Sequence, residues 1–380
     1  MSNLRPKARE GTETAMEFMV DRALSPERLH ALAHPRDWPD HAPDNDVAPE
    51  SGALSRATWD AALGDVARDI LCRPSRRFRA RMCEVAWRLA DGAGDIPAQL
   101  PALIEVIHAG SLIVDDIEDG STVRRGAPSL HVIHGMPRAL NTGNWMYFWA
   151  MDLVDQLALP TSKAHEVRQA LSDAMYRCHL GQSLDLSVAV GALPRPWVYR
   201  TVATSTMLKT GALMELAARL GALAAAAAPA RVEALARFGR RLGLGLQMLD
   251  DFGNLNAPPA DAGDSKALED LRNGRPTWPW ARAALDLDDP TFAHLQASAR
   301  ALVQKGEGLG GGGGTGEGDT EHSRARALAA ELRMAVGLAG RRQTSSYLRR
   351  TLHELREVVG DREELVLLTS EMHRLEDFYG

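Results

Sequence analysis

The chain has 380 residues, with 44 Lys and Arg against 50 Asp and Glu, and therefore a formal net charge of −6. Apolar residues make up 45% and charged residues 25%, as in an ordinary globular protein that is long enough to bury a sizeable core. A mildly acidic chain is a poor candidate for wrapping nucleic acid, because neutralising phosphates requires a basic face. The three cysteines have neither paired nor zinc-type spacing, so neither a disulfide scaffold nor a structural zinc site is indicated.

The N-terminal segment is polar and mixed in charge, unlike a secretory leader. No window contains the roughly 18 uninterrupted apolar residues that a membrane span requires. We therefore expect a soluble cytoplasmic protein. Residues 1–50 contain scattered Pro, His and Asp and are expected to form an irregular extension.

The rest of the chain, residues 51–380, is predicted to be helical. Alanine, leucine and arginine dominate and isoleucine is scarce, which favours helices over sheet. Short breaks are expected at 135–137 and before Pro229, and the glycine-rich segment 305–320 is expected to be a flexible insertion. Because the helical pattern continues on both sides of that segment, we predict an all-α fold, a single large bundle rather than two domains.

The first chemical signal is the acidic run 115–119, Asp-Asp-Ile-Glu-Asp, which follows an apolar helical segment. Asp115 and Asp119 are four residues apart and share one helix face, where like charges are unfavourable unless a cation compensates them. A solvated acidic helix end is the alternative interpretation.

A second acidic pair, Asp250 and Asp251, follows another apolar helix, RRLGLGLQML. Two such helix ends could face one another across a cavity. Clustered carboxylates suit Mg²⁺, which binds through one or two carboxylates together with substrate phosphates. The segments contain no His or Cys set that would favour zinc.

Basic side chains that suit phosphate oxygens accompany both acidic segments. For any one of them a role on the solvated surface is the simpler interpretation, so the argument depends on their joint occurrence. These residues are Arg76, Arg77, Arg79, Arg124, Arg125, Lys209 with Thr210, Lys266 and Arg275.

With these motifs the chain resembles the trans-isoprenyl diphosphate synthases, or polyprenyl synthetases. SLIVDDIEDGSTVRRGAPSLHVIHG is similar to the first aspartate-rich region of that family, LQMLDDFGN is similar to the second, and PSRRFRARM stands where the family has a basic Gly-Lys-x-x-Arg segment. The stretches LNTGNWMYFWAM, EDLRNGRPTWP and SYLRRTLHELREVVG most resemble geranylgeranyl diphosphate synthases of the eukaryotic type. The resemblance covers residues 60–300 and 325–375.

The resemblance implies an isoprenoid synthase bundle around a central apolar cavity. It also implies a Mg²⁺-dependent condensation of isopentenyl diphosphate with a C5 to C15 allylic diphosphate, in a homodimer. The residues implied to hold Mg²⁺ are Asp115, Asp116, Asp119, Asp250 and Asp251, which with Lys209 form the implied catalytic set. Those implied to contact the allylic diphosphate are Arg124, Lys209, Thr210, Gln247, Lys266 and Arg275. Those implied to bind isopentenyl diphosphate are Arg76, Arg79, His108 and Arg125.

Three positions depart from the family pattern. Ser75-Arg76 stands in place of Gly-Lys, Asn254 in place of an aspartate, and Arg275 in place of a lysine. The substitutions at 76 and 275 keep the positive charge, so an active enzyme is still expected.

Product length depends on the side chains below the first aspartates. Gly110 and Ser111 are small, so no aromatic side chain blocks growth there, and we predict a C20 product. Aromatic residues on a later helix are candidates for a deeper floor, or for ordinary core: Trp145, Tyr147, Phe148 and Trp149.

Two other hypotheses stay open. A class I terpene cyclase would also be all-α and use an aspartate-rich Mg²⁺ site, but it would leave the second set of basic residues unexplained. A regulatory subunit with the same fold and weak catalysis is the second alternative, suggested by the altered segment around Arg76 and the long extension.

Overall fold

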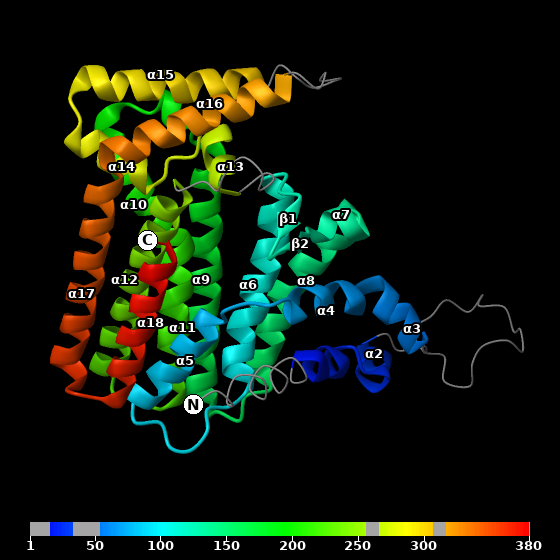
Figure 1. The fold of residues 1–380 in the computed structure, drawn as a ribbon. Helices are drawn as coiled ribbons and strands as arrows, with labels where there is room; N and C mark the ends of the chain where they lie inside the picture. Colours follow the sequence, from blue (N-terminus) through cyan, green and yellow to red (C-terminus); the bar gives the residue numbers. More distant parts are fainter. Residues whose placement is uncertain (1–15, 33–53, 256–265, 307–316, 380) are drawn as a thin grey trace, which may run out of the picture. The chain divides into compact units, whose positions relative to one another are not determined.

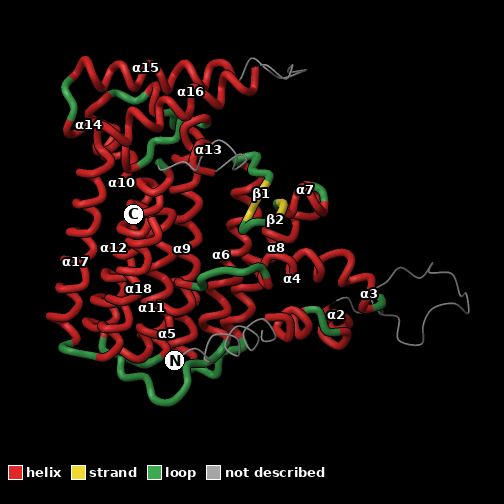
Figure 2. The backbone as a smooth tube through the Cα atoms, viewed as in Figure 1, coloured by secondary structure: helices red, strands yellow, loops and turns green. Residues whose placement is uncertain are grey.

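The predominance of good helix formers produces an almost entirely helical structure, which confirms the all-α prediction. The structure, a computed structural model, describes residues 16–32, 54–255, 266–306 and 317–379 (Figures 1 and 2). Within these ranges the only strands are β1 (Val123–Arg124) and β2 (Ala127–Pro128), which pair as a short antiparallel hairpin. None of the described helices combines the length and apolar character needed to cross a membrane.

The chain divides into two compact units, one formed by residues 1–77 with 102–156 and the other by 78–101 with 157–380. This division into compact units does not test the prediction that residues 51–380 form one domain. The first unit contains α2 (Pro26–Leu32), α3 (Arg56–Trp59), the π-helix η2 (Asp60–Gly64), α4 (Asp65–Cys72), most of α6 (Gln99–Glu118), the hairpin, α7 (Leu130–His134) and α8 (Met136–Asp155).

The second unit is a larger set of helices. Its elements are α5 (Phe78–Leu89), α9 (Thr161–Ser187), η3 (Val190–Ala192), α10 (Arg195–Thr206), the π-helix η4 (Met207–Gly211), α11 (Ala212–Ala224), α12 (Pro229–Asn254), α13 (Lys266–Arg272), α14 (Trp278–Asp286), α15 (Asp289–Gly306), α16 (Glu317–Leu332), the π-helix η6 (Arg333–Gly337), α17 (Leu338–Val359) and α18 (Glu363–Tyr379). Helix α11 packs against α5, α9 and α12, while α15 and α16 cross the ends of the long helices (Figure 1).

The predicted breaks coincide with helix ends. A glycine with positive φ, Gly135, separates α7 from α8, and α12 begins at Pro229 after α11 ends at Ala224. The glycine-rich segment is shorter than expected, because α15 extends to Gly306 and α16 begins at Glu317. The remainder, 307–316, lies outside the described residues.

The N-terminal extension differs from the irregular segment that we expected. Residues 16–23 and α2 are helical, and Met16, Val20 and Leu24 are buried. Their spacing of four residues forms a single apolar stripe, which the scattered proline and histidine further along the extension obscured. Residues 33–50 lie outside the described part of the chain.

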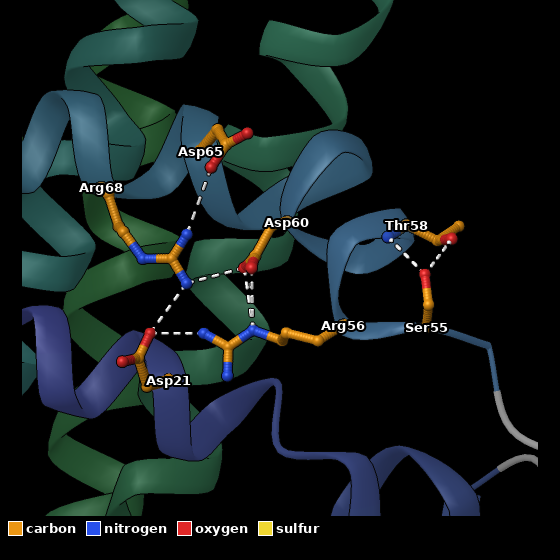
Figure 3. A network of polar contacts seen from close by, with 7 residues as sticks. All are labelled: Asp21, Ser55, Arg56, Thr58, Asp60, Asp65 and Arg68. Carbon is orange, nitrogen blue, oxygen red and sulfur yellow. Dashed lines mark hydrogen bonds and ion pairs between the residues drawn. The ribbon is translucent and has the colours of Figure 1, made fainter.

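Charged side chains attach this N-terminal helix to the rest of the first unit (Figure 3). Asp21 accepts hydrogen bonds from Arg56 and Arg68, the latter at 2.8 Å. Both arginines also bind Asp60 in η2, and Arg68 pairs with Asp65 at 3.3 Å. These groups are partly exposed, so each pair contributes only modestly, but the network fixes the helix against α3 and α4.

In the second unit, the backbones of α5 and α11 approach closely at Gly221. A Cβ atom on Gly221 would lie 2.2 Å from the main-chain oxygen of Cys83 and 2.8 Å from the main-chain nitrogen of Trp87. Because both atoms belong to the backbone, no side-chain rotation can relieve the overlap. Glycine at 221 therefore sets the distance between the two helices.

Replacing Gly221 by alanine is expected to lower the free energy of unfolding by about 1–3 kcal/mol, because the two helices must separate. Urea unfolding followed by circular dichroism measures this loss. The matched control is Gly337→Ala, where the nearest neighbour of a new Cβ is the flexible Arg333 side chain at 3.3 Å. That control should gain stability, or keep it, because alanine is the better helix former. Equal effects of the two substitutions would contradict the prediction.

Candidate functional site

The C-terminal end of α6 carries the first acidic cluster, as predicted. Asp115 and Asp116 lie in its last turn, and Asp119 follows the helix with its main-chain N–H donating to Asp115 O at 2.8 Å. Gly120 has a φ of 67°, and Ser121 N–H then donates to Asp116 O, which closes the helix end. Carboxylates at a helix C-terminus oppose the helix dipole, so a nearby positive charge is favourable.

Arg124 supplies that positive charge from β1. Its Nε donates to Asp116 Oδ1 at 2.7 Å, its Nη2 contacts the same oxygen, and Nη2 lies 3.5 Å from Asp115 Oδ2. All three side chains are largely buried: Arg124 is 12% exposed, Asp115 14% and Asp116 3%. The structure therefore brings three predicted site residues together at one end of α6.

The hairpin geometry follows from a two-residue turn. Val123 pairs with Pro128 and Arg124 with Ala127, so Arg125 and Gly126 form the loop. Both have positive φ, 55° and 77°, as a type I′ turn requires. Arg125 extends back to α4, where its Nη1 donates to Ile70 O at 3.3 Å.

The other predicted residues of the first unit are less closely grouped. His108 is half-buried on α6, two turns before Asp115, and its main-chain oxygen accepts a hydrogen bond from Ser111. Arg76 is exposed in the loop after α4. Their grouping with the cluster at Asp116 stays a prediction.

In the second unit, hydrogen bonds connect three predicted residues in a chain. Thr210 Oγ1 donates to Gln247 Oε1 at 2.8 Å, and Gln247 Nε2 donates to Asp251 Oδ1 at 2.7 Å. The other oxygen of Asp251 accepts the main-chain N–H of Trp278 at 2.9 Å. The structure thus joins η4 to the C-terminal part of α12 through polar side chains.

Asp251 is buried beside other negatively charged side chains. Burial raises the pKa of the Asp251 carboxyl well above its ordinary value, and the charges of Asp270 and Asp250 raise this pKa further. Hydrogen bonds from Gln247 and Trp278 oppose the shift without cancelling it. A bound cation would relieve the repulsion that the charges of Asp250 and Asp270 exert on the charged form of Asp251.

Lys209 is held beside a residue that sequence reasoning missed, Asp185 at the end of α9. Lys209 Nζ lies 2.9 Å from Asp185 Oδ2, and Arg275 donates to the main-chain oxygen of Asp185. A Cβ on Gly181 would lie 2.7 Å from the Lys209 main-chain nitrogen, so this glycine allows α9 to approach η4. The overlooked signal is Gln182 and Asp185 at helical spacing just before the end of α9.

Two predicted residues remain from the second unit. Arg79 on α5 is close enough to Cys178 for its charge to act on that thiol. Burial raises the pKa of Cys178 to about 11, and the charges of Arg79, Arg177 and Lys209 oppose this rise. Lys266 is the first residue of α13, but its side chain lies outside the described atoms. Asp270, on the same helix, was not among the predicted site residues.

The residues considered for product length lie in different environments within the first unit. Gly110 faces α8 directly, since a Cβ there would lie 2.9 Å from Gly143 O and 3.4 Å from the Tyr147 ring. Trp145 stacks on Trp149 with ring centroids 4.9 Å apart, whereas Phe148 is 74% exposed. The small residue at 110 therefore allows close helix packing, and the C20 product stays a prediction.

The acidic residues suit a hard cation that takes part of its ligands from water and phosphate, rather than a cation bound by protein side chains alone. Among the described residues, no three His, Cys, Asp or Glu side chains converge on one point as a ready metal site. Carboxylates supply the oxygen ligands that Mg²⁺ prefers, and Mg²⁺ usually completes its shell with water and phosphate oxygens. The donor set suits a metal that arrives with, or is shared by, a phosphorylated ligand.

Comparisons with known proteins agree with this chemistry. The family model described as Polyprenyl synthetase matches residues 60–301. A geranylgeranyl pyrophosphate synthase of Eremothecium gossypii is 29% identical over 238 residues, which cover 60% of this chain and 73% of that protein. A short chain isoprenyl diphosphate synthase of Methanocaldococcus jannaschii is 32% identical over 237 residues, covering 60% and 68%.

Among solved structures, the fold is similar to that of a geranylgeranyl pyrophosphate synthase from Corynebacterium glutamicum, complexed with isoprenyl diphosphate and magnesium. The TM-score is 0.69 at 20% sequence identity, and the match covers 97% of each chain. At this level of identity the likeness shows the fold alone.

Proposed function

Because this chain belongs to the polyprenyl synthetase family, we propose that it is a Mg²⁺-dependent trans-prenyltransferase that condenses isopentenyl diphosphate with an allylic diphosphate. The observation that carries the proposal is the contact of Arg124 with Asp116 and Asp115 at the end of α6. An arginine fork beside two carboxylates provides ligands both for a metal and for the diphosphate that shares it.

The proposed reaction begins with loss of diphosphate from the allylic carbon. The isopentenyl double bond then attacks that carbon, and loss of a proton from the resulting cation forms the new double bond. Bound Mg²⁺ would neutralise the charge that develops on the departing diphosphate. Arg124 and Lys209 would each donate to diphosphate oxygens, and the low exposure of Arg124, 12%, strengthens its contact. Their carboxylate partners, Asp116 and Asp185, would hold both cations in position before the substrate binds.

The remaining assignments are part of the same proposal. Asp119, Asp250 and Asp251 would complete the metal ligands. Thr210, Gln247, Lys266 and Arg275 would join Arg124 and Lys209 on the allylic diphosphate. Arg76, Arg79, His108 and Arg125 would bind isopentenyl diphosphate. We also propose a C20 product.

We further propose that the protein acts in the cytoplasm as a homodimer. Exposed apolar side chains on α9, among them Tyr176 and Leu180, support self-association of the second unit. Light scattering of the purified chain measures its mass directly. A monomer at micromolar concentration would contradict the dimer without affecting the proposed reaction.

The purified chain should elongate an allylic primer only when Mg²⁺ and isopentenyl diphosphate are both present. Separate incubations with C5, C10 and C15 primers, followed by mass analysis of the dephosphorylated products, test this expectation. We expect a C20 alcohol from at least one primer. Hydrocarbon release from an allylic diphosphate alone would indicate a cyclase, and no turnover with any primer would favour a regulatory subunit.

A further inference from the structure

A buried arginine ends α4 and is not among the predicted site residues. Arg73 is followed by Pro74, which disfavours the helical conformation in the preceding residue, and Arg73 accordingly has ψ of 141°. The helix stops and the Arg73 side chain is only 6% exposed. Burying a guanidinium is costly unless its donors are satisfied, so its partners carry information.

Those partners are the two strands of the hairpin. Arg73 Nη1 donates to Arg124 O at 3.0 Å, and Nη2 donates to Pro128 O at 2.9 Å. The remaining edge of the fork, Nε, donates to Asp69 Oδ1 at 2.7 Å, one turn earlier on α4. One guanidinium therefore connects α4 to β1 and β2 at the same time.

The hairpin depends on such support. Its strands are two residues long, and an isolated two-stranded hairpin is marginally stable in water. It nevertheless presents Arg124 to Asp116 and Arg125 to the carbonyl of Ile70. Because Arg73 binds the main-chain oxygen of Arg124 itself, a shift of Arg73 moves the backbone from which the Arg124 side chain extends.

Asp69 orients the guanidinium of Arg73 and also contacts His134 at the end of α7. Its Oδ1 accepts from Arg73, while its Oδ2 lies 3.4 Å from His134 Nε2. Lysine cannot reproduce the arrangement, because its single ammonium group lacks the planar set of donors that reaches two carbonyls and a carboxylate at once.

We propose that Arg73 is a positioning residue for diphosphate binding, which fixes the β1–β2 hairpin so that Arg124 and Arg125 face the substrate diphosphate. It touches no substrate in this arrangement and acts through the hairpin backbone. The inference rests on the proposed function, since that function assigns the diphosphate to Arg124 and Arg125.

The test is Arg73→Lys, which preserves the charge and removes the fork. Binding of inorganic pyrophosphate in the presence of Mg²⁺, measured by calorimetry, should weaken by about 10-fold or more, as is usual when an outer support of a site is lost. KM for the diphosphate substrates should rise by a similar factor. Hydrogen exchange should become faster at residues 122–129, including the Ser129 amide that donates to Thr122 O.

The matched control is Arg68→Lys on the same helix. Arg68 also binds several acceptors, but they are Asp21, Asp60 and Asp65, away from the hairpin (Figure 3). This control should leave pyrophosphate affinity and exchange in the hairpin unchanged. If Arg73→Lys fails to fold, Asp69→Asn replaces it, because it loosens the same fork and should weaken pyrophosphate binding in the same direction.

The outcomes separate the two proposals. Unchanged pyrophosphate affinity and hairpin exchange in a folded Arg73→Lys protein would overturn the positioning role, even if the wild-type protein elongates primers. Equal weakening in Arg68→Lys would also overturn it, since the effect would then be general destabilisation. Absence of elongation by the wild-type protein would overturn the proposed function, while pyrophosphate binding would still report on the hairpin.

Discussion

Replacing Asp115 by asparagine is expected to lower prenyl-transfer turnover by about 10²–10³-fold, the usual effect of removing one electrostatic support of a transition state. The carboxylate lies beside the Arg124–Asp116 contact, and asparagine retains its size while removing the charge that we propose attracts Mg²⁺. Turnover measured with isopentenyl diphosphate and an allylic primer, over a range of Mg²⁺ concentrations, tests this.

The control is Glu118→Gln, at the end of the same helix. Glu118 is exposed and its substitution makes the same change in net charge, so turnover should remain within about 2-fold if only the carboxylates beside Arg124 matter. Circular dichroism should show equal helix content for both variants. Full activity in the Asp115→Asn protein would contradict the assignment of this helix end as the metal site.

The second large effect is expected at Glu215, where Glu215→Gln should lower the free energy of unfolding by about 3 kcal/mol. The side chain is 4% exposed and binds Arg177, Arg219 and Arg240, with contacts of 2.8 Å to Arg177 and Arg240. Glutamine fits the same space but leaves three arginines without their shared anion. The arginines are partly exposed, so the lower end of the range for a broken buried pair applies.

Chemical denaturation measures the Glu215 effect, and Glu233→Gln is its control. Glu233 binds the same Arg219 at 2.8 Å but is 51% exposed, so its loss should cost no more than about 1 kcal/mol. Equal losses for the two substitutions would show that burial around Glu215 does not matter.

The contribution of Glu215 also depends on pH. Burial alone would raise the pKa of its carboxyl, but hydrogen bonds from Arg240 and Arg177 outweigh burial and hold the pKa below its ordinary value. Because the folded-state pKa is lowered, this stabilisation is fully present above the unfolded pKa of about 4.3 and is lost as the pH falls below it. The stability difference between wild type and Glu215→Gln should therefore shrink between about pH 5 and pH 3.

The sequence made the helices predictable because its apolar periodicity and helix breakers are local signals. The position of Asp115 and Asp116 at a helix end followed from the apolar run before them, and the structure confirms it. The end of α12 at Asn254, just after Asp250 and Asp251, followed in the same way. Their placement relative to helix ends needed no knowledge of tertiary contacts.

Other features were missed, because they depend mainly on contacts distant in sequence. Asp185 pairs with Lys209 only because Gly181 lets α9 approach η4. Nothing in the local sequence distinguishes Arg73 from the other arginines, because its partners are the carbonyls of Arg124 and Pro128 in the hairpin. The hairpin was overlooked because two residues per strand give no alternating pattern to detect.

The π-helical turn η4 has a consequence for how the chain tolerates insertion and deletion. A π turn holds one residue more than an α-helical turn, so it rotates the following helix by about 100° relative to the one before. Helices α10 and α11 follow one another with only η4 between them. The offset at η4 lets α10 pack against α14 while α11 packs against α5. Deleting one residue from η4 would restore a regular helix, but it would bring α10 and α11 into one phase and turn either Lys209 or Glu215 away from its neighbours.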